Sequence, residues 1–122
     1  MPDDAVAAAL GMVIVEERPG RAVVTMTVRD DMVNGLGVCH GGMIFTLADT
    51  AMAYASNAAG PVALASSATI EFLRPATLGM VLTATCDAVT TAGRSVVHDT
   101  TVTAEDGATI AMFRGRTVTT TR

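Results

Sequence analysis

The chain has 122 residues, of which half are hydrophobic, and a formal net charge of −4. This length and composition predict a single globular domain over residues 1–122 and exclude a disordered chain. Because no run of basic residues is present, we expect no nucleic-acid partner. Asp3 and Asp4 stand where a secretory signal carries positive charge, and the apolar run after them is too short for a membrane span. Two cysteines form no disulfide framework, so we expect a cytoplasmic protein with no membrane partner.

The first 28 residues predict a short helix followed by a β-hairpin. Residues 3–11 (DDAVAAALG) predict the helix, with Asp3 or Asp4 as its N-cap. Residues 12–28 carry apolar positions on both sides of Pro19-Gly20, a turn signal, and the second half alternates as a half-buried strand does.

A glycine-rich loop over residues 29–42 separates this hairpin from the only long helix candidate, residues 41–59, which Gly60-Pro61 ends. The rest of the chain predicts strands joined by tight turns, and its C-terminal threonine run is expected to fray. The strands are expected over residues 61–75, 80–91, 94–106 and 108–121.

Strands that follow one another through tight turns form antiparallel sheets. One nearly all-apolar helix needs that sheet to cover it. The predicted fold class is therefore α+β, with a curved antiparallel sheet wrapped around one central helix. The edges of such a sheet need cover, so we also expect an oligomer.

Asp49 lies in the middle of the predicted helix, on a narrow face whose residues are polar or small. That face either meets solvent, with Asp49 as an ordinary surface charge or cap, or it serves a function. The second interpretation is favoured because the face carries no Lys, Glu or Arg. Its members are Thr46, Asp49, Thr50, Ala53, Ser56 and Asn57.

Gly41 and Gly42 stand where this helix begins, and glycines there leave backbone N–H groups open to an anion or a developing oxyanion. Such an amide and a carboxylate are the minimum requirement for acyl transfer. Within one helix, however, Gly41 and Asp49 lie about 12 Å apart at 1.5 Å per residue. They meet at one substrate only if a second copy of the helix runs antiparallel to the first, which predicts a homodimer with its active sites at the interface.

The segment HGGMIFTLADTAMAYASN, followed by ATIEFLRPA, resembles the hotdog-fold acyl-CoA thioesterases, most closely the PaaI-type thioesterases of bacterial phenylacetate degradation. The resemblance is strongest over residues 34–75 and includes an acidic residue eight positions after the first glycine of H-G-G. It implies the hotdog fold, in which the long helix is the sausage and the sheet the bun. It also implies dimers that pair into a dimer-of-dimers tetramer.

The resemblance further implies a role for four residues. Asp49 is the nucleophile or general base, and the Gly41 N–H donates to the thioester carbonyl from the opposite subunit. Asn34 helps to place the substrate, and His40 mainly holds the loop. No metal or redox cofactor is implied, since CoA is part of the substrate; His40 lacks partners for a metal site, because the other histidine, His98, completes no usual ligand spacing.

Two further groups are candidate substrate-binding residues. Ser66 or Ser67 is expected to face the site, because side chains alternate along a strand, unless both only fill space beneath the helix. Arg74, in the motif FLRP, and then Arg94 are the preferred candidates for the CoA phosphates. Each could equally be an ordinary surface charge.

The sequence thus predicts an acyl-CoA thioesterase that hydrolyses an aryl-acyl-CoA, such as phenylacetyl-CoA or a ring-hydroxylated relative, to the free acid and CoA. Two alternatives remain open at this stage. One is a hotdog dehydratase or hydratase acting on acyl-CoA or acyl carrier protein, with His40 as the working base. The other is a non-catalytic acyl-CoA binding protein, which needs no carboxylate in the helix.

Overall fold

The computed structural model describes residues 3–120, and the expected order of elements is confirmed there. A short 3-10 helix, η1, interrupts the predicted loop. In chain order the elements are α1 (Ala5–Ala9), β1 (Val13–Arg18), β2 (Arg21–Thr27), η1 (Asp30–Met32), α2 (Gly41–Asn57), β3 (Ala63–Phe72), β4 (Val81–Ala92), β5 (Ser95–Thr103) and β6 (Thr109–Thr119).

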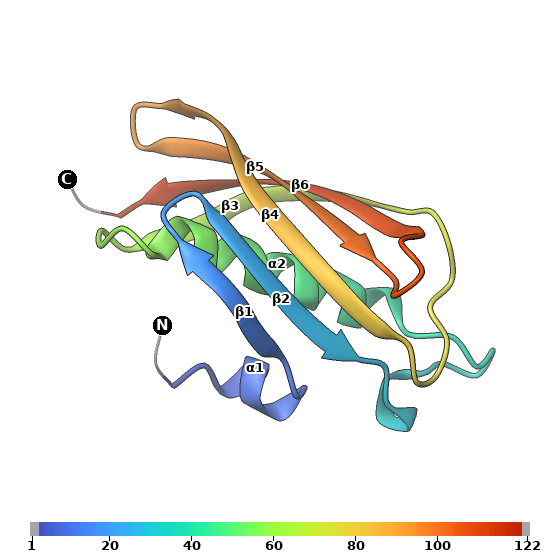
Figure 1. Cartoon of the computed structure of the whole chain (residues 1–122). Helices are drawn as coiled ribbons and strands as arrows, with labels where there is room; N and C mark the ends of the chain where they lie inside the picture. Colours follow the sequence, from blue (N-terminus) through green and yellow to red (C-terminus); the bar gives the residue numbers. More distant parts are fainter. Residues whose placement is uncertain (1–2, 121–122) are drawn as a thin grey trace.

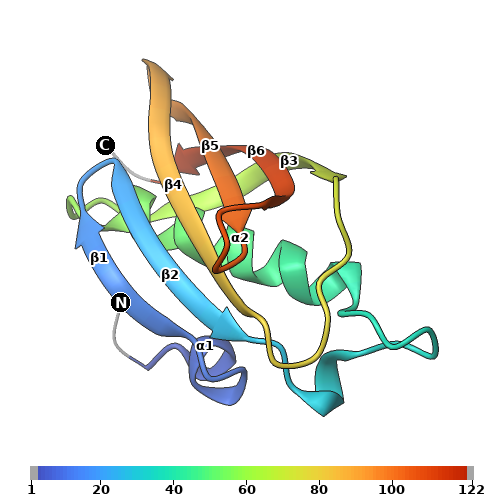
Figure 2. The ribbon, with the colours of Figure 1, turned by 45° about the vertical axis from the view of Figure 1, so that its right-hand side comes forward.

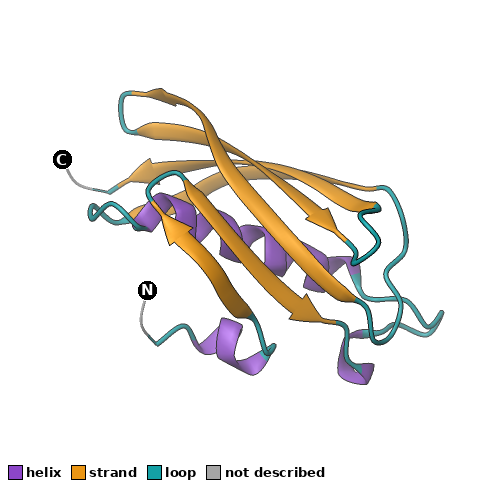
Figure 3. Cartoon of the chain, in the orientation of Figure 1, coloured by secondary structure: helices purple, strands orange, loops and turns teal. Residues whose placement is uncertain are grey.

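The strands of the described chain form one six-stranded antiparallel sheet in the order β1-β2-β4-β5-β6-β3. The sheet curves around α2, which contacts all six strands (Figures 1 and 3). The turned view places α1 beside the start of β1, away from the centre of the sheet (Figure 2). The predicted α+β architecture, a curved sheet around one long helix, is therefore confirmed.

Burial follows the alternation that the sequence predicts. In β2, Ala22, Val24 and Met26 are buried against the helix, and the residues between them are not. The buried face of α2 is mostly aliphatic and alanine-rich, which lets the helix lie close to the sheet. Its buried residues are Ile44, Leu47, Ala48, Thr50, Ala51, Met52, Tyr54 and Ala55.

The short N-terminal helix is capped as expected, since the Asp4 carboxylate accepts a hydrogen bond of 3.0 Å from the Ala7 N–H. No helix within residues 3–120 has the length and hydropathy of a membrane span.

The expectation of a frayed C-terminal threonine run is wrong as far as residue 120. Thr117 is 2% exposed and pairs with Val96 of β5 and Ala65 of β3. The Thr120 N–H donates to the Val62 carbonyl at 2.9 Å. Strand pairing on both sides orders this segment, because β6 lies inside the sheet rather than at its edge. Thr121, the last residue of the predicted strand, lies outside the described residues.

We predict that Gly115→Ala destabilises the protein. A Cβ on Gly115 would collide with the Met52 sulfur and would lie 2.9 Å from Cε1 of Phe113. Overpacking of this kind costs about 1–3 kcal/mol, so the thermal midpoint should fall by several degrees in a calorimetric scan. Gly35→Ala is the control, since a Cβ there meets nothing within 4 Å.

Because a Cβ on Gly115 would collide with Met52, substitutions at these two positions should be energetically coupled, and a double variant measures that coupling. Gly115→Ala combined with Met52→Ala should lose less stability than the two single changes added together, since contacting residues couple. An unchanged midpoint for Gly115→Ala alone would show that α2 does not pack on β6 at this point.

Candidate active site

Asn34 shapes the loop that leads into α2. Its side-chain carbonyl oxygen accepts hydrogen bonds from the backbone N–H groups of Leu36 at 2.9 Å and Val38 at 3.3 Å. Its own N–H donates to the Val38 carbonyl at 2.8 Å. The side-chain oxygen is therefore committed to the turn, while the side-chain NH₂ has no partner among the described residues. That NH₂ is the group that Asn34 could offer to a substrate.

His40 holds the end of this loop through its backbone. Its N–H donates to the Met32 carbonyl at 2.8 Å, and its carbonyl accepts from the N–H of Met43 at 3.0 Å. The imidazole is exposed and makes no hydrogen bond within residues 3–120. In this chain His40 therefore holds the loop through its backbone hydrogen bonds and not through its imidazole.

Gly41 opens α2 and lies under the ring of Phe72, the last residue of β3. A Cβ on Gly41 would approach Cζ of that ring to 3.0 Å, which explains why glycine stands here although its φ is not left-handed. Neither the Gly41 nor the Gly42 N–H has an acceptor in the described part of the chain. Two open N–H groups at the positive end of a 17-residue helix form a site for partial negative charge.

Asp49 differs from the other polar side chains on its face of α2. The hydroxyls of Thr46, Thr50 and Ser56 donate to backbone carbonyls one helical turn back, over 2.7–3.2 Å. The Asn57 side chain bonds to Ala53 and, in both directions, to the backbone of Ala63. The Asp49 carboxylate alone has no hydrogen bond or ion pair within residues 3–120.

The Asp49 carboxylate is half-buried at a cavity of about 230 Å³ between α2 and the first residues of β3. Burial raises the pKa of this carboxyl above its ordinary value, because an apolar surrounding disfavours the charged form. The half-buried position and the raised pKa favour a functional role for Asp49 over that of an ordinary surface charge. The other residues that line the cavity are Met52, Ala53, Ser56, Asn57, Ala63, Leu64, Ala65 and Thr117.

Gly41 and Asp49 lie on the same flank of α2, the one that faces β3. Phe72, at the end of β3, contacts Gly41, whereas Leu64 and Ala65, at its start, line the Asp49 cavity. The eight residues between Gly41 and Asp49 amount to about 12 Å of helix. A single chain thus carries both groups on one flank without bringing them together.

The two serines of β3 do not alternate as expected, because a β-bulge falls on them. Ala65 pairs with Thr117 and Ser67 with Arg116, so that Ser66 is the extra residue. The Ser66 hydroxyl accepts a 2.6 Å hydrogen bond from the exposed Arg116 guanidinium. Both serines are exposed, and neither lies beneath the helix.

Arg74 and Arg94 are exposed and lie at opposite ends of β6. The Arg74 guanidinium donates to the Thr109 carbonyl at 3.2 Å, where β6 begins. The Arg94 carbonyl accepts from the N–H of Thr119, where β6 ends. The 11 residues of β6 span about 33 Å at 3.3 Å per residue, so the two arginines of one chain do not serve one phosphate group.

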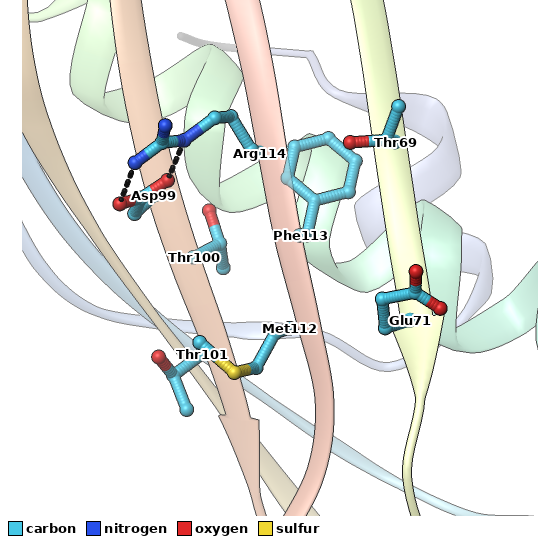
Figure 4. Close-up of a pocket in the computed structure, with 8 residues that line it drawn as sticks. All are labelled: Thr69, Glu71, Asp99, Thr100, Thr101, Met112, Phe113 and Arg114. Atoms are coloured by element: carbon cyan, nitrogen blue, oxygen red, sulfur yellow. Dashed lines mark hydrogen bonds and ion pairs between the residues drawn. The ribbon is translucent and has the colours of Figure 1, made fainter.

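The outer face of the sheet also carries a depression, of about 280 Å³ (Figure 4). None of its lining residues belongs to α2 or lines the Asp49 cavity. Its Arg114 guanidinium is neutralised by a two-bond ion pair with Asp99 at 2.6 and 2.7 Å. Nothing in it resembles an acyl-transfer site. Its lining consists of Thr69, Glu71, Asp99, Thr100, Thr101, Met112, Phe113 and Arg114.

Both cysteines are free and buried. Burial raises the pKa of the Cys39 thiol, and raises the pKa of Cys86 to about 11, so neither thiol is an activated nucleophile. No group of three or more His, Cys, Asp or Glu side chains within residues 3–120 is placed to hold a metal ion.

Residues 36–111, more than half of the chain, match the family described as the thioesterase superfamily. The chain belongs to the thioesterase superfamily. Within this superfamily it is a homologue of the acyl-coenzyme A thioesterase PaaI of Escherichia coli K12, with 47% identity over 114 residues that cover 93% of this chain and 81% of the relative. The resemblance stated from the sequence is thus confirmed.

Solved structures of this superfamily share the fold closely. The E. coli PaaI protein from the phenylacetic acid degradation operon matches with a TM-score of 0.95 and 45% identity, over 98% of this chain and 86% of its own. A Streptococcus mutans protein solved with bound acetyl-CoA matches with a TM-score of 0.87 and 29% identity, over 91% and 90% of the two chains. These matches confirm the hotdog fold.

Three residues of this region were not expected from the sequence. Phe72 belongs to the FLRP motif, and its place two residues before Arg74 could have drawn attention to it. Leu64 and Thr117 carry no local signal, because their position beside Asp49 depends on how β3 pairs with β6.

We predict that Asp49→Asn stabilises the protein at neutral pH. The folded-state pKa of Asp49 is raised, so the buried charge destabilises the native state at any pH above that value. Asparagine keeps the shape without the charge, and the thermal midpoint at pH 7 should rise by a few degrees.

The rise in thermal midpoint that Asp49→Asn gives should become smaller as the pH falls. It should shrink between the raised pKa of Asp49 and about 3.9, the ordinary value for aspartate, because wild-type Asp49 becomes protonated in that range. Glu71→Gln is the control, because it removes a carboxylate that is exposed on β3. A lower midpoint for Asp49→Asn at pH 7 would contradict the view that Asp49 is held in place without a partner.

Proposed function

We propose that the protein is an acyl-CoA thioesterase that hydrolyses an aryl-acyl-CoA to the free acid and CoA. The observation that carries this proposal is the half-buried, unpartnered Asp49 on the same flank of α2 as the open Gly41 N–H. A perturbed carboxylate and an oxyanion-stabilising amide are the two groups that thioester hydrolysis requires. The name of the E. coli relative and the acetyl-CoA bound to the S. mutans relative support the substrate class.

The active site is completed by a second copy of the chain. β3 is an edge strand, and most of its residues are exposed. If two copies pair their β3 strands antiparallel about a twofold axis near Ala68, the Leu64 end of one copy lies beside the Phe72 end of the other. Asp49 of one chain then faces Gly41 of its partner. The tetramer that the resemblance implies stays a prediction.

Each active site divides the chemistry between the two chains. The Gly41 N–H of one chain donates to the thioester carbonyl and stabilises the negative charge that develops on its oxygen. Asp49 of the other chain attacks the carbonyl carbon or takes a proton from the water that does. Its raised pKa makes it a stronger base than an ordinary aspartate. The CoA thiolate then leaves, and the Asn34 NH₂ is available to orient the substrate.

This arrangement also places the two arginines. Arg74 comes two residues after Phe72 and therefore lies on the Gly41 side of its own chain. Arg94 of the partner chain lies on the side of that chain that carries Asp49. In the proposed dimer both flank the same active site from different chains. They are the candidates for the CoA phosphates, because their guanidinium groups form no ion pair in the described chain.

The preference for an aryl group rests on the E. coli relative, whose structure comes from the phenylacetic acid degradation operon, and on the short, mostly apolar cavity at Asp49. The hydratase alternative gains no support, since no carboxylate contacts the exposed His40 in the described residues. The free, buried cysteines suit a reducing compartment, which supports a cytoplasmic location.

We predict that Asp49→Asn lowers kcat/KM for phenylacetyl-CoA at least about 100-fold, because an acid/base group is lost. Thiol release measured with a chromogenic reagent reports the rate, and retained binding of CoA shows that the site remains formed. In the wild-type enzyme kcat/KM should fall as the pH drops through the raised pKa of Asp49, so that the acid limb lies above the ordinary aspartate value. Unchanged hydrolysis by the variant would remove Asp49 from the mechanism.

We also predict that two inactive variants regain activity as a mixed dimer. Gly41→Pro removes the N–H, and proline is favoured at the first helical position. His40 already has the extended conformation, φ −56° and ψ 135°, that precedes proline. Gly41→Pro alone should lose about 10²–10³ in kcat, whereas Gly41→Ala, which keeps the N–H, should lose far less.

When Gly41→Pro and Asp49→Asn chains are co-expressed, a mixed dimer contains one site with both groups intact and one with neither. Activity per mixed dimer should therefore return to about half of the wild-type value. Activity no higher than that of either variant would show that Gly41 and Asp49 act within one chain, and would overturn the shared site.

A further inference from the structure

His98 is a buried imidazole that the reaction described above does not use. It lies in β5, is 1% exposed and points toward the helix side of the sheet. Neither ring nitrogen has a hydrogen-bond partner within residues 3–120, and Nδ1 is fully shielded from solvent. A buried polar group without a partner is costly, and such groups call for an explanation.

The His98 side chain lines a cavity of about 200 Å³ between the C-terminal half of α2 and strands β4, β5 and β6. This cavity and the Asp49 cavity share three lining residues, Ser56, Ala63 and Thr117. The two spaces are therefore neighbours along α2, with Asp49 at one end and His98 at the other. Of the shared residues, Thr117 is also buried and its hydroxyl has no partner in the described chain.

The size of this space suits one aromatic ring. Asp49 and Ser56 are seven residues apart, or about 10 Å along the helix. A thioester carbon held about 3 Å from the Asp49 carboxylate leaves about 7 Å for the acyl group, which fits one methylene and a ring. A cavity of about 150 Å³ is known to hold benzene in another protein, so the 200 Å³ around His98 admits a ring as well.

We propose that His98 is a specificity-determining residue that binds the ring hydroxyl of a 4-hydroxyarylacetyl-CoA, at the end of the acyl group farthest from the thioester. This inference rests on the proposed function. A neutral imidazole donates from one nitrogen and accepts at the other, and a phenolic hydroxyl also does both. The Thr117 hydroxyl is a second possible partner for the same oxygen.

The chemistry of the cavity supports a neutral ligand group. Burial lowers the pKa of His98, which keeps the imidazole uncharged at neutral pH. Four of the nine remaining lining residues are alanines, which contact a ring without competing for its hydroxyl: Ala55, Ala59, Ala63 and Ala88. The other five are Gly20, Ser56, Thr91, Val96 and Thr119. The alternative is that a buried water hydrogen-bonds to the His98 imidazole. In that case His98 would not change the preference between hydroxylated and unhydroxylated substrates.

The test compares the hydrolysis of 4-hydroxyphenylacetyl-CoA and phenylacetyl-CoA. The wild-type enzyme should prefer the hydroxylated substrate, and His98→Leu should lower that ratio of kcat/KM values about three- to tenfold, the range for one neutral hydrogen bond. His98→Gln, which can still hydrogen-bond, should keep part of the preference. Thr100→Val is the matched control: Thr100 is buried on the same strand but does not line the cavity.

Two results would overturn the proposal: an equal fall for both substrates in His98→Leu, which indicates a purely structural role, or no preference in the wild type. A binding measurement distinguishes failure of the hydroxyl-binding proposal from failure of the proposed thioesterase function. NMR of the wild-type imidazole should show His98 signals shifting with p-cresol and not with toluene. If neither thioester is hydrolysed but p-cresol shifts His98, the proposed function fails and the hydroxyl-binding site stands; no shift removes the site.

Discussion

The proposed active site depends on one constraint: the Asp49 carboxylate faces a mostly apolar cavity and has no partner in the described chain. α2 satisfies its threonine, serine and asparagine side chains through its own backbone or β3, and leaves Asp49 alone. Desolvation without a partner raises the carboxyl pKa and costs stability. The same desolvation makes the carboxylate a better base. The desolvation that costs stability thus also suits Asp49 to the proposed role of base.

The packing of α2 on β3 decides where this carboxylate can act. Because β3 runs past α2 with its start at Asp49 and its end at Gly41, the two reactive groups mark opposite ends of one open edge. An edge strand that pairs with a copy of itself reverses direction across the twofold axis. In the proposed dimer, one association covers the open edge and brings Gly41 of one chain to Asp49 of the other. Each proposed active site then needs residues from both chains.

Small side chains between the helix and the sheet leave the space that a substrate would occupy. Aromatic residues make up only 3% of the chain, and alanines of α2 and β3 line both cavities. Larger residues in these positions would fill these spaces. Two titratable side chains lie along this space, the Asp49 carboxylate at one end and the buried His98 imidazole at the other.

The sequence by itself determined the elements and singled out Gly41 and Asp49 as the candidate reactive groups. The turn at Pro19-Gly20, the alternation of β2 and the helix from Gly41 follow from local periodicity and from residues with special backbone preferences, which act over a few positions. The pattern around Gly41 and Asp49 was sufficient to predict an acyl-transfer site. The tertiary structure alone decided the bulge that turns both Ser66 and Ser67 outward, the ordering of the threonine run and the cavity at His98. Each of these depends on the register between strands far apart in the chain, such as β3 and β6, and no local pattern encodes that register.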